Sequence, residues 1–242
     1  LVSNITFAQW QFEGAAQFTN DATDVAITTD NNDVPYVAYA DNTDGLVHVK
    51  KFDGTNWVDV GINATGVVIP SLMAIAINPV TGHPWVAYRN NSTSRLDVVK
   101  FDGTSWTDIG TSGTWGASSA ELLAIAINPV TDMPWVAWKE GSVIKVYSYD
   151  GTNWNFDSQP PLWAPQNVAP LEFVFNSSNE PVIYYHKSGG TSSLRDYVRV
   201  FKQAAWGGTN IWTSFSSSAV VTTDRRGESI LNELAQTSNS SQ

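Results

Sequence analysis

The chain has 242 residues, no cysteine and a formal net charge of -10 at pH 7. Without cysteine it has no disulfide framework, thiol nucleophile or zinc–thiolate site, and its acidic balance argues against nucleic acid, which needs clustered Lys and Arg. No apolar run approaches the roughly 20 residues of a membrane helix, so we expect no membrane insertion.

One unit of sequence recurs along the chain. Residues 35–61 read PYVAYADNTDGLVHVKKFDGTNWVDVG, and similar text returns at residues 84–110, at 134–154 and, more loosely, at 181–206. The prolines that open these copies are spaced by 49, 50 and 47 residues. Together with the apolar run before each proline, every unit holds four short alternating runs separated by turn residues, which predicts four strands, A to D. A four-stranded unit of this length is typical of a β-propeller blade.

The two ends of the chain each supply half of a further unit. Trp10 lies 47 residues before Trp57, so residues 1–14 predict strands C and D. Residues 220–224, VVTTD, match AITTD at the start of the first unit, so residues 219–242 predict strands A and B.

We therefore predict an all-β fold, a five-bladed β-propeller of four-stranded antiparallel blades. Its last blade is closed by the N- and C-terminal strands, which leaves no open edge between the first and last blades. The whole chain, 1–242, forms this single domain. Blades one to four are expected at about residues 24–61, 72–110, 122–158 and 170–215.

The loops between strands B and C and between strands D and A vary in length and chemistry, whereas the A–B turns resemble one another. The B–C loops are expected at residues 41–45, 89–95, 139–142 and 186–195, and the D–A loops at 62–70, 111–120, 159–169 and 207–218. Propeller geometry brings both sets to one end, so we place function there. The polar candidates for ligand binding at this end are Asp41, Asp44, Arg89, Asn91, Arg95 and His186.

The aromatic residues fall into a repeated set and a set outside the repeat. The repeated ones are expected to pack in and between blades: Trp57, Trp106, Trp154 and Trp206 at the start of strand D, and Tyr36, Trp85, Trp135, Tyr39, Tyr88, Trp138 and Tyr185 on strand B. Trp115, Trp163 and Trp212 lie in the D–A loops. A flat indole there suits the apolar face of a sugar ring, so these three are candidate ligand-binding residues; the alternative is that they cap the blade ends.

Catalytic and metal-binding patterns are sparse. A glycosidase needs two carboxylates roughly 5 to 10 Å apart. Glu172 interrupts an A strand, and we expect it to form a buried ion pair, with Arg195 or another loop cation, rather than to act in catalysis. In the catalytic alternative, Glu121 and Asp24 are the candidate partner carboxylates. The three histidines occupy unlike positions, which argues against a histidine metal cluster or triad. We therefore predict no catalytic residue.

Two turns rich in Asn and Asp, residues 30–33 and 41–45, offer oxygen ligands that Ca²⁺ accepts. The same residue types are the ordinary chemistry of turns. We expect no metal site and no cofactor, with a structural calcium ion as the alternative.

The repeated VPYVAY and FDGTxW segments resemble tandem β-propeller repeats of secreted and surface-associated bacterial proteins, over nearly the whole chain. The Asp-Gly-x-x-Trp turn is similar to the Asp-box of sialidase-like propellers, S-x-D-x-G-x-x-W, although here Asp directly precedes Gly and the Ser is absent. In blade number the chain is similar to the five-bladed lectins of the tachylectin type. The resemblance implies a fold and no particular activity.

Low charge content, abundant Ser, Thr and Asn, and 11 tryptophans favour a secreted or cell-surface acidic protein. We expect a non-enzymatic extracellular binding module that recognises a glycan or a surface glycoprotein through the loop face, in a lectin-like or adhesion role. The alternative is a structural or assembly module of a larger surface protein or filament, which binds protein neighbours or copies of itself. A glycoside hydrolase or lyase is the third reading.

Overall fold

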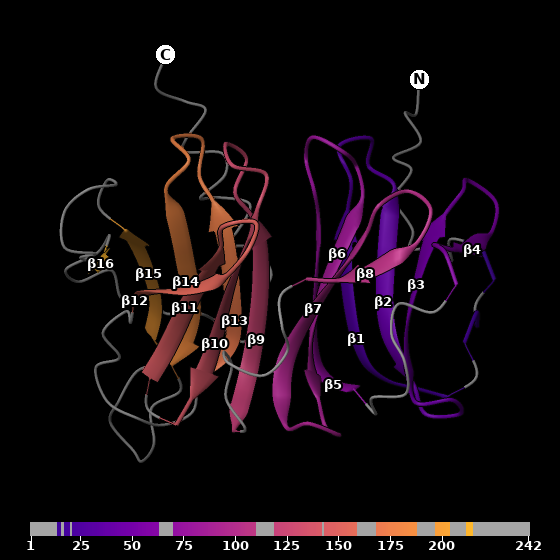
Figure 1. Ribbon diagram of the computed structural model, residues 1–242, viewed down its shortest axis with the longest axis horizontal. Coiled ribbons are helices and arrows are strands. Elements are labelled where there is room, and N and C mark those ends of the chain that lie inside the picture. Colours follow the sequence, from indigo (N-terminus) through magenta and orange to yellow (C-terminus); the bar gives the residue numbers. More distant parts are fainter. Residues whose placement is uncertain are drawn as a thin grey trace, which may run out of the picture.

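The structure of the protein, a computed structural model, describes residues 14–15, 17–19, 21–62, 70–109, 119–141, 143–158, 168–187, 197–203 and 212–214. All regular elements in these ranges are strands, which form four four-stranded antiparallel sheets (Figure 1). The described ranges hold no helix long and apolar enough to cross a membrane.

Each sheet is a run of consecutive strands joined by hairpins. The first contains β1 (Ala22–Thr29), β2 (Pro35–Asp41), β3 (Leu46–Phe52) and β4 (Trp57–Asp59). The second contains β5 (Pro70–Ile77), β6 (Pro84–Asn90), β7 (Arg95–Phe101) and β8 (Trp106–Asp108). The third contains β9 (Ala120–Ile127), β10 (Pro134–Glu140), β11 (Val143–Tyr149) and β12 (Trp154–Ser158). The fourth contains β13 (Val168–Phe175), β14 (Pro181–Lys187), β15 (Tyr197–Gln203) and β16 (Trp212–Ser214).

In the first three sheets, the turn that connects the third and fourth strands is built by an aspartate side chain. Asp53 Oδ1 accepts hydrogen bonds from the backbone N–H groups of Thr55 and Asn56 at 2.8 and 2.7 Å. Asp102 and Asp150 do the same in the second and third sheets. Asp directly before Gly therefore sets these hairpins, because the carboxylate replaces a backbone acceptor and Gly supplies the positive φ of the turn.

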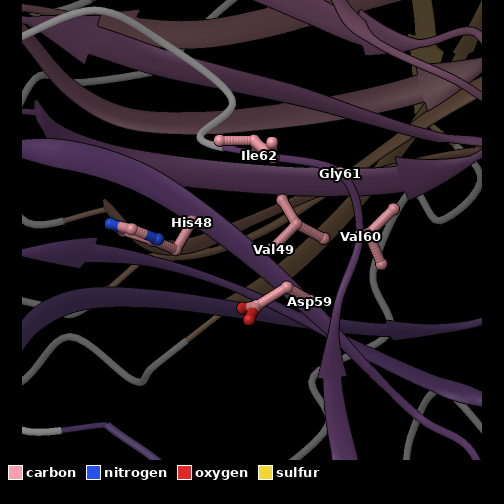
Figure 2. Close-up of a pocket in the computed structure, with 6 residues that line it drawn as sticks. All are labelled: His48, Val49, Asp59, Val60, Gly61 and Ile62. Atoms are coloured by element: carbon pink, nitrogen blue, oxygen red, sulfur yellow. The ribbon is translucent and has the colours of Figure 1, made fainter.

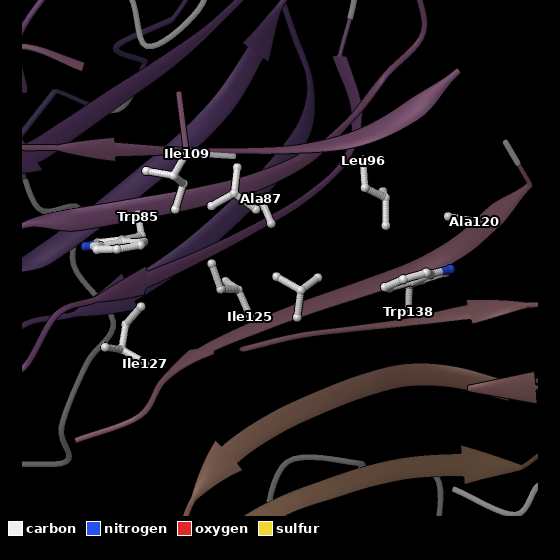
Figure 3. Close-up of a cluster of buried hydrophobic side chains, with 10 residues drawn as sticks. Trp85, Ala87, Leu96, Ile109, Ala120, Ile125, Ile127 and Trp138 are labelled. Carbon is white, nitrogen blue, oxygen red and sulfur yellow. The ribbon is translucent and has the colours of Figure 1, made fainter. Parts of the chain in front are cut away.

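The core lies between neighbouring sheets. One face of the second sheet, with Trp85, Ala87 and Leu96, packs against Ile125 and Trp138 of the third (Figure 3). Equivalent clusters join the first sheet to the second and the third to the fourth. The first strands contact one another in sequence: β1 meets β5, β5 meets β9 and β9 meets β13. Small residues on these strands, such as Ala124 and Ala126, permit this close approach.

Of the strand-B aromatics predicted to pack between blades, those whose side chains are described are all buried. They are Tyr36, Tyr39, Trp85, Tyr88, Trp135 and Trp138. The side chain of Tyr185 lies outside the described set.

In the second and third sheets, a tryptophan ties the fourth strand to the sheet before it. The indole Nε1 of Trp106, in the second sheet, donates to the carbonyl oxygen of Val60 in the first at 2.7 Å. Trp154, in the third sheet, donates to the carbonyl oxygen of Ile109 in the second at 3.0 Å. Gly61 lies beneath Trp106 with φ +74°, and a Cβ built there would lie 2.8 Å from Phe101 Cε2. The prediction that Trp106 and Trp154 pack within the framework is confirmed.

The last strand of the fourth sheet differs from the predicted one. We expected Trp206 to open its last strand and Trp212 to lie in the following loop, but β16 begins at Trp212, whose backbone pairs with that of Gln203. In the first sheet only four residues separate the corresponding pair, Phe52 and Trp57. The spacing of the repeat misled the prediction, because this hairpin is longer and lacks the Asp-Gly turn.

The described residues hold four sheets. The segments predicted to form a fifth blade, at residues 1–13 and 219–242, lie outside them.

Candidate functional site

In the first three sheets, the loop between the second and third strands lies beside the start of the first strand. The backbone N–H of Asn42 donates to the carbonyl of Asp21 at 2.9 Å. In the second sheet Ser71 Oγ donates to Asn91 Oδ1 at 3.0 Å, and in the third Ser119 Oγ donates to Glu140 Oε1 at 3.3 Å. These contacts define one end of the molecule, here called the loop end.

Asp41 and Asp44 both lie at the loop end of the first sheet. Asp41 is the last residue of β2 and accepts a hydrogen bond from the Thr43 N–H at 2.8 Å, which lowers the pKa of its carboxyl. Asp44 Oδ1 accepts from the Leu46 N–H at 3.0 Å, and its Oδ2 lies 2.9 Å from His48 Nε2. Both carboxylates thus stabilise the turn, and Asp44 also orients an imidazole.

Arg89, Asn91 and Arg95 surround the corresponding loop of the second sheet. Only Asn91 lies in the loop; Arg89 belongs to β6 and Arg95 opens β7. We predicted all three in a loop at residues 89–95. That boundary is wrong, because the hairpin ladder continues through polar residues, with Arg89 opposite Leu96 and Asn90 opposite Arg95.

Two further residues that we predicted in loops also lie in strands. Asp41 belongs to β2, and His186 belongs to β14, where its backbone pairs with Val198 instead of starting a loop. Trp212 belongs to β16, as described above. Trp115 and Trp163 lie outside the described residues, as do the side chains of His186 and Trp212. The binding roles of these residues stay predictions.

A pocket of about 260 Å³ opens in the first sheet, where His48 contacts Asp44 (Figure 2). Its lining residues come from β3, from the last residue of β4 and from the three residues that follow it: His48, Val49, Asp59, Val60, Gly61 and Ile62. Figure 2 shows Asp59 and Ile62 on opposite sides, with His48 and Val49 between them. The pocket therefore joins an imidazole and a carboxylate to an apolar side chain, Ile62, that is 89 % exposed.

Neighbouring residues hold the polar side chains of the pocket in place. The ring of His48 stacks on Tyr39 with centroids 5.4 Å apart, while Asp44 contacts its Nε2. Lys50 Nζ lies 2.6 Å from Asp59 Oδ1. Burial raises the pKa of Tyr39 to about 12, with contributions from the charges of three aspartates, Asp59, Asp41 and Asp44. Three carboxylates therefore lie close enough to this tyrosine to act on it, and one of them, Asp59, is paired with Lys50.

The second sheet places different groups at the same positions. Asp97 faces Tyr88 across the strands, as His48 faces Tyr39, and Asp108 takes the place of Asp59. Asp97 is buried; its Oδ2 accepts a hydrogen bond from Asn90 Nδ2 at 2.7 Å, and among the described residues its Oδ1 has no hydrogen-bond partner.

Burial raises the pKa of the Asp97 carboxyl. The pKa of Asp108 is raised as well, first by desolvation on its inner side and then by the charge of Asp97, although much of its surface is exposed. The second sheet thus carries two carboxyl groups of raised pKa where the first carries His48 and Asp59.

The third sheet has ion pairs at its loop end. Lys139 is buried and contacts Glu121, and Lys145 contacts Glu140. Glu121, which we considered as a partner of Glu172, is therefore engaged within its own sheet.

Glu172 lies on β13, opposite Tyr184. We expected a buried ion pair, but the side chain is exposed, because no described sheet covers this face; Arg195 lies outside the described residues. Its own sheet still removes part of its hydration, and this partial burial raises the pKa of its carboxyl.

The sequence prediction missed four residues of these clusters: His48, Asp59, Asp97 and Asp108. They lie within strands, whereas we searched for function in loops. A signal was present: the strand-C position of His48 is Asp97 in the next unit and Lys145 in the third, all polar within otherwise apolar alternation.

The described residues form no recognisable metal site. In the parts of the chain that the structure describes, no three His, Asp or Glu side chains converge to hold an ion. Asp30 in the turn at residues 30–33 accepts the N–H groups of Asn32 and Val34, as Asp41 accepts that of Thr43. These carboxylates act as turn acceptors, and a structural calcium ion stays a prediction.

No protein-family model and no curated protein matches this sequence. Solved structures do. A variant of the Aleuria aurantia lectin in complex with Fucα1-6GlcNAc has a TM-score of 0.52 at 16 % identity, over 82 % of this chain and 64 % of that one. AofleA from Arthrobotrys oligospora has a TM-score of 0.52 at 14 % identity, over 79 % of this chain and 56 % of that one.

An exo-β-1,3-galactanase from Phanerochaete chrysosporium, solved with β-1,3-galactotriose, has a TM-score of 0.50 at 12 % identity, over 86 % of this chain and 52 % of that one. The chain thus spans about half to two thirds of the length of these proteins. At such identities the likeness shows the fold alone, a propeller-like array of repeated four-stranded sheets.

Proposed function

We propose that this protein is a non-enzymatic extracellular binding module, secreted or held at a cell surface, that recognises a glycan or glycoprotein at its loop end. The pocket formed by His48, Asp59 and Ile62 carries this proposal. It has the composition of a sugar subsite: polar groups of fixed orientation that can bind hydroxyls, beside an exposed aliphatic side chain that can meet a C–H face of the ring.

The fold part of the proposal is a five-bladed propeller of the type found in tandem repeats of surface-associated proteins. Its last blade combines residues 1–14 with residues 219–242, and the whole chain forms one domain. The internal repeat and the propeller-like neighbours support this arrangement. No cofactor is part of the proposal.

The charge around the pocket narrows the ligand class. Asp41, Asp44 and Asp59 all act on the same tyrosine, so the site favours neutral or amino sugars over sugars that carry a carboxylate or sulfate. The lectin among the structural neighbours was solved with a neutral disaccharide. That neutral ligand agrees with the preference proposed here for neutral or amino sugars.

A glycan array probed with the full chain is the first test, followed by calorimetric titration with the best neutral, amino and anionic sugars. We expect binding to neutral or amino sugars, and a loss of roughly 1 to 3 kcal/mol for Asp59→Asn, as for a central contact. Asp53→Asn, in a turn at the opposite end of the strands, is the matched control and should bind as the wild type does. Retained binding by Asp59→Asn would move the site elsewhere, and no binding to any sugar would overturn the glycan proposal.

The alternative is an assembly module that binds protein neighbours. It draws on two exposed apolar sheet faces, one on β1 with Val25 and Ile27 and one on β13 with Val174. Light scattering over a range of protein concentrations distinguishes the two proposals, because an assembly module should gain mass without any sugar. A hydrolase would instead turn over a polysaccharide, and Glu172→Gln should then abolish that turnover.

A further inference from the structure

The side of the second sheet that packs on the first sheet carries two carboxyl groups near the loop end. In the strand register Asp97 lies opposite Tyr88, and Asp108 lies opposite Val99. Tyr88 and Val99 belong to the hydrophobic cluster between the first and second sheets. Residues paired across strands share a face, as do residues two apart along a strand, so both carboxyl groups lie on this side of the sheet. Asp97 is buried there and Asp108 is exposed, so the pair extends from the interior of the junction to its surface.

The negative charge of Asp97 is only partly compensated. Its Oδ2 accepts a hydrogen bond from Asn90 Nδ2 at 2.7 Å, and its Oδ1 has no hydrogen-bond partner among the described residues. Burial raises the pKa of its carboxyl more than the Asn90 hydrogen bond and the charge of Arg95 lower it. In the described structure Arg95 forms no ion pair with either carboxylate. A buried carboxylate with one unpaired oxygen is costly to keep, which points to a cation from outside the chain.

The first sheet places a lysine beside the equivalent exposed carboxylate. Lys50 lies opposite Asp59 and forms an ion pair with it at 2.6 Å. The position of Lys50 is Val99 in the second sheet, so Asp108 lacks this partner. The pKa of Asp108 is raised, first by desolvation and then by the charge of Asp97. The second sheet thus holds two carboxyl groups that repel each other where the first sheet holds an ion pair.

The two carboxyl groups also lie beside the pocket of the first sheet. Trp106 Nε1 donates to the Val60 carbonyl oxygen at 2.7 Å, and Asp108 follows two residues later on the same face of β8, roughly 7 Å along the strand. Residues 60–62 line the pocket. Val60 packs toward the second sheet, whereas His48 lies on the other face of the first sheet. The segment 60–62 therefore has the polar groups of the pocket on one side and the carboxyl groups of the second sheet on the other.

A monovalent organic cation fits this arrangement better than a metal ion does. Calcium takes roughly six to eight oxygen ligands, and in the described ranges no third His, Asp or Glu joins the two carboxylates. A protonated primary amine carries one positive charge and three N–H donors, so one carboxylate can hold it while the second attracts it. An amine at this place would reduce the repulsion between Asp97 and Asp108.

We propose that Asp97 and Asp108 form a second subsite, which binds the protonated amine of an amino sugar next to the sugar residue held in the pocket. Asp108 contacts the amine, and Asp97 contributes its charge from inside the junction. This inference rests on the binding function proposed above and narrows its ligand to an oligosaccharide that carries a free amino group. A lysine side chain is the other source of the same ammonium chemistry.

Calorimetric titration of the full chain with a short β-1,4-linked glucosamine oligomer and with its fully N-acetylated form tests this proposal. At pH 6, where primary amines are protonated, the free amines should raise the affinity by about fivefold, the upper end for an exposed ion pair. Asp108→Asn should remove this preference. Asp102→Asn is the matched control, because it removes the same charge from an exposed turn at the other end of the same sheet, and it should keep the preference. Equal affinities of the wild type for the two oligomers, or a preference that survives Asp108→Asn, would overturn the proposal.

Further measurements separate this subsite from the pocket. Asp97→Asn should reduce the preference without abolishing it, because Asp108 still contacts the amine; an unchanged preference would contradict the role of Asp97. Asp59→Asn should weaken both oligomers by the same factor. If it changes neither affinity while the amine preference remains, the pocket proposal fails and the second subsite stands. Competition by Nα-acetyl-lysine methylamide as strong as that by the amino sugar would assign the subsite to lysine side chains and overturn the sugar ligand. Binding of neither oligomer would overturn both proposals.

Discussion

At the two junctions that join the first three sheets the same contact is made, whereas at the loop ends equivalent positions carry different side chains. Trp106 and Trp154 each donate an indole hydrogen bond to the exit of the preceding sheet. At the loop end, by contrast, the residue that faces the strand-B aromatic is His48, Asp97 or Lys145 in successive sheets.

This difference suggests that the junction residues maintain the fold, whereas the loop-end residues are free to serve binding. A junction side chain serves two sheets at once, so changing it affects both packing surfaces and leaves little freedom for variation. A loop-end side chain contacts its own sheet and solvent, and polar pairs there can be exchanged at little cost. We therefore expect substitutions at junctions to change the free energy of unfolding and substitutions at the loop end to change binding.

The largest effect is expected for Trp106→Ala. The substitution removes a packed indole and leaves the Val60 carbonyl without its donor, so it should lower the free energy of unfolding by about 3 to 5 kcal/mol. Denaturant titration followed by circular dichroism measures this. Phe156→Ala is the control, because Phe156 lies on the fourth strand of the third sheet but is 53 % exposed. Similar losses for the two variants would contradict the special role of the junction.

The glycine beneath that indole gives a finer test. A Cβ at Gly61 would meet Phe101 and Trp106 at 3.0 Å or less, and its φ of +74° is strained for alanine. Gly54 has φ +97° and open space around it. Gly54→Ala should therefore cost about 1 kcal/mol for backbone strain alone, and Gly61→Ala about 2 to 4 kcal/mol for strain plus overpacking. Equal melting temperatures would show that the junction tolerates an added methyl group.

The sequence alone predicted the scaffold well because the scaffold repeats. Four strands per unit, the Asp-Gly turns and the buried aromatics all follow from two-residue alternation and from recurrence. The prediction failed where recurrence stopped, as at the long hairpin before Trp212. It also placed Arg89 and His186 in loops, because polarity was read as a loop signal although strand pairing depends on the backbone.

The candidate site was harder to predict. His48 and Asp59 lie 11 positions apart on different strands, and only the pairing of β3 with β4 brings them together around one pocket. Sequence reasoning proposed Asp41 and Asp44, which lie near the pocket, because polar residues in a variable loop are visible without the register; their binding roles stay predictions. It missed the residues that line the pocket itself.

The carboxyl pair of the second sheet predicts a pH effect of intermediate size. The folded-state pKa of Asp97 is raised by burial, so the folded protein binds this proton more tightly than the unfolded chain does. Its contribution to stability is therefore fully present below the ordinary aspartate pKa of about 3.9 and is lost as pH rises through the raised value. Asp97→Asn should remove this pH-dependent loss of stability, because asparagine does not ionise. The free energy of unfolding of the variant, relative to that of the wild type, should therefore rise from pH 4 upward.

Asp102→Asn is the control of opposite sign. Backbone N–H groups of Ser105 and Thr104 lower the pKa of the Asp102 carboxyl, so its contribution is present above the ordinary pKa and is lost as pH falls. The difference curve for this variant should therefore slope the other way. Parallel curves for the two variants, measured by denaturant titration at several pH values, would contradict the assignment for Asp97.

The smallest effect on folding is expected for His48→Ala. The imidazole contacts an Asp44 side chain that is 42 % exposed, and such a pair is worth at most about 1 kcal/mol, so the melting temperature should change by only a few degrees. The same substitution removes one wall of the pocket and the ring that stacks on Tyr39. Affinity for a neutral sugar should therefore fall about tenfold or more while stability is nearly kept, the reverse of Trp106→Ala. A variant that loses stability and keeps its affinity would place His48 with the scaffold and return the search for the site to the loop tryptophans.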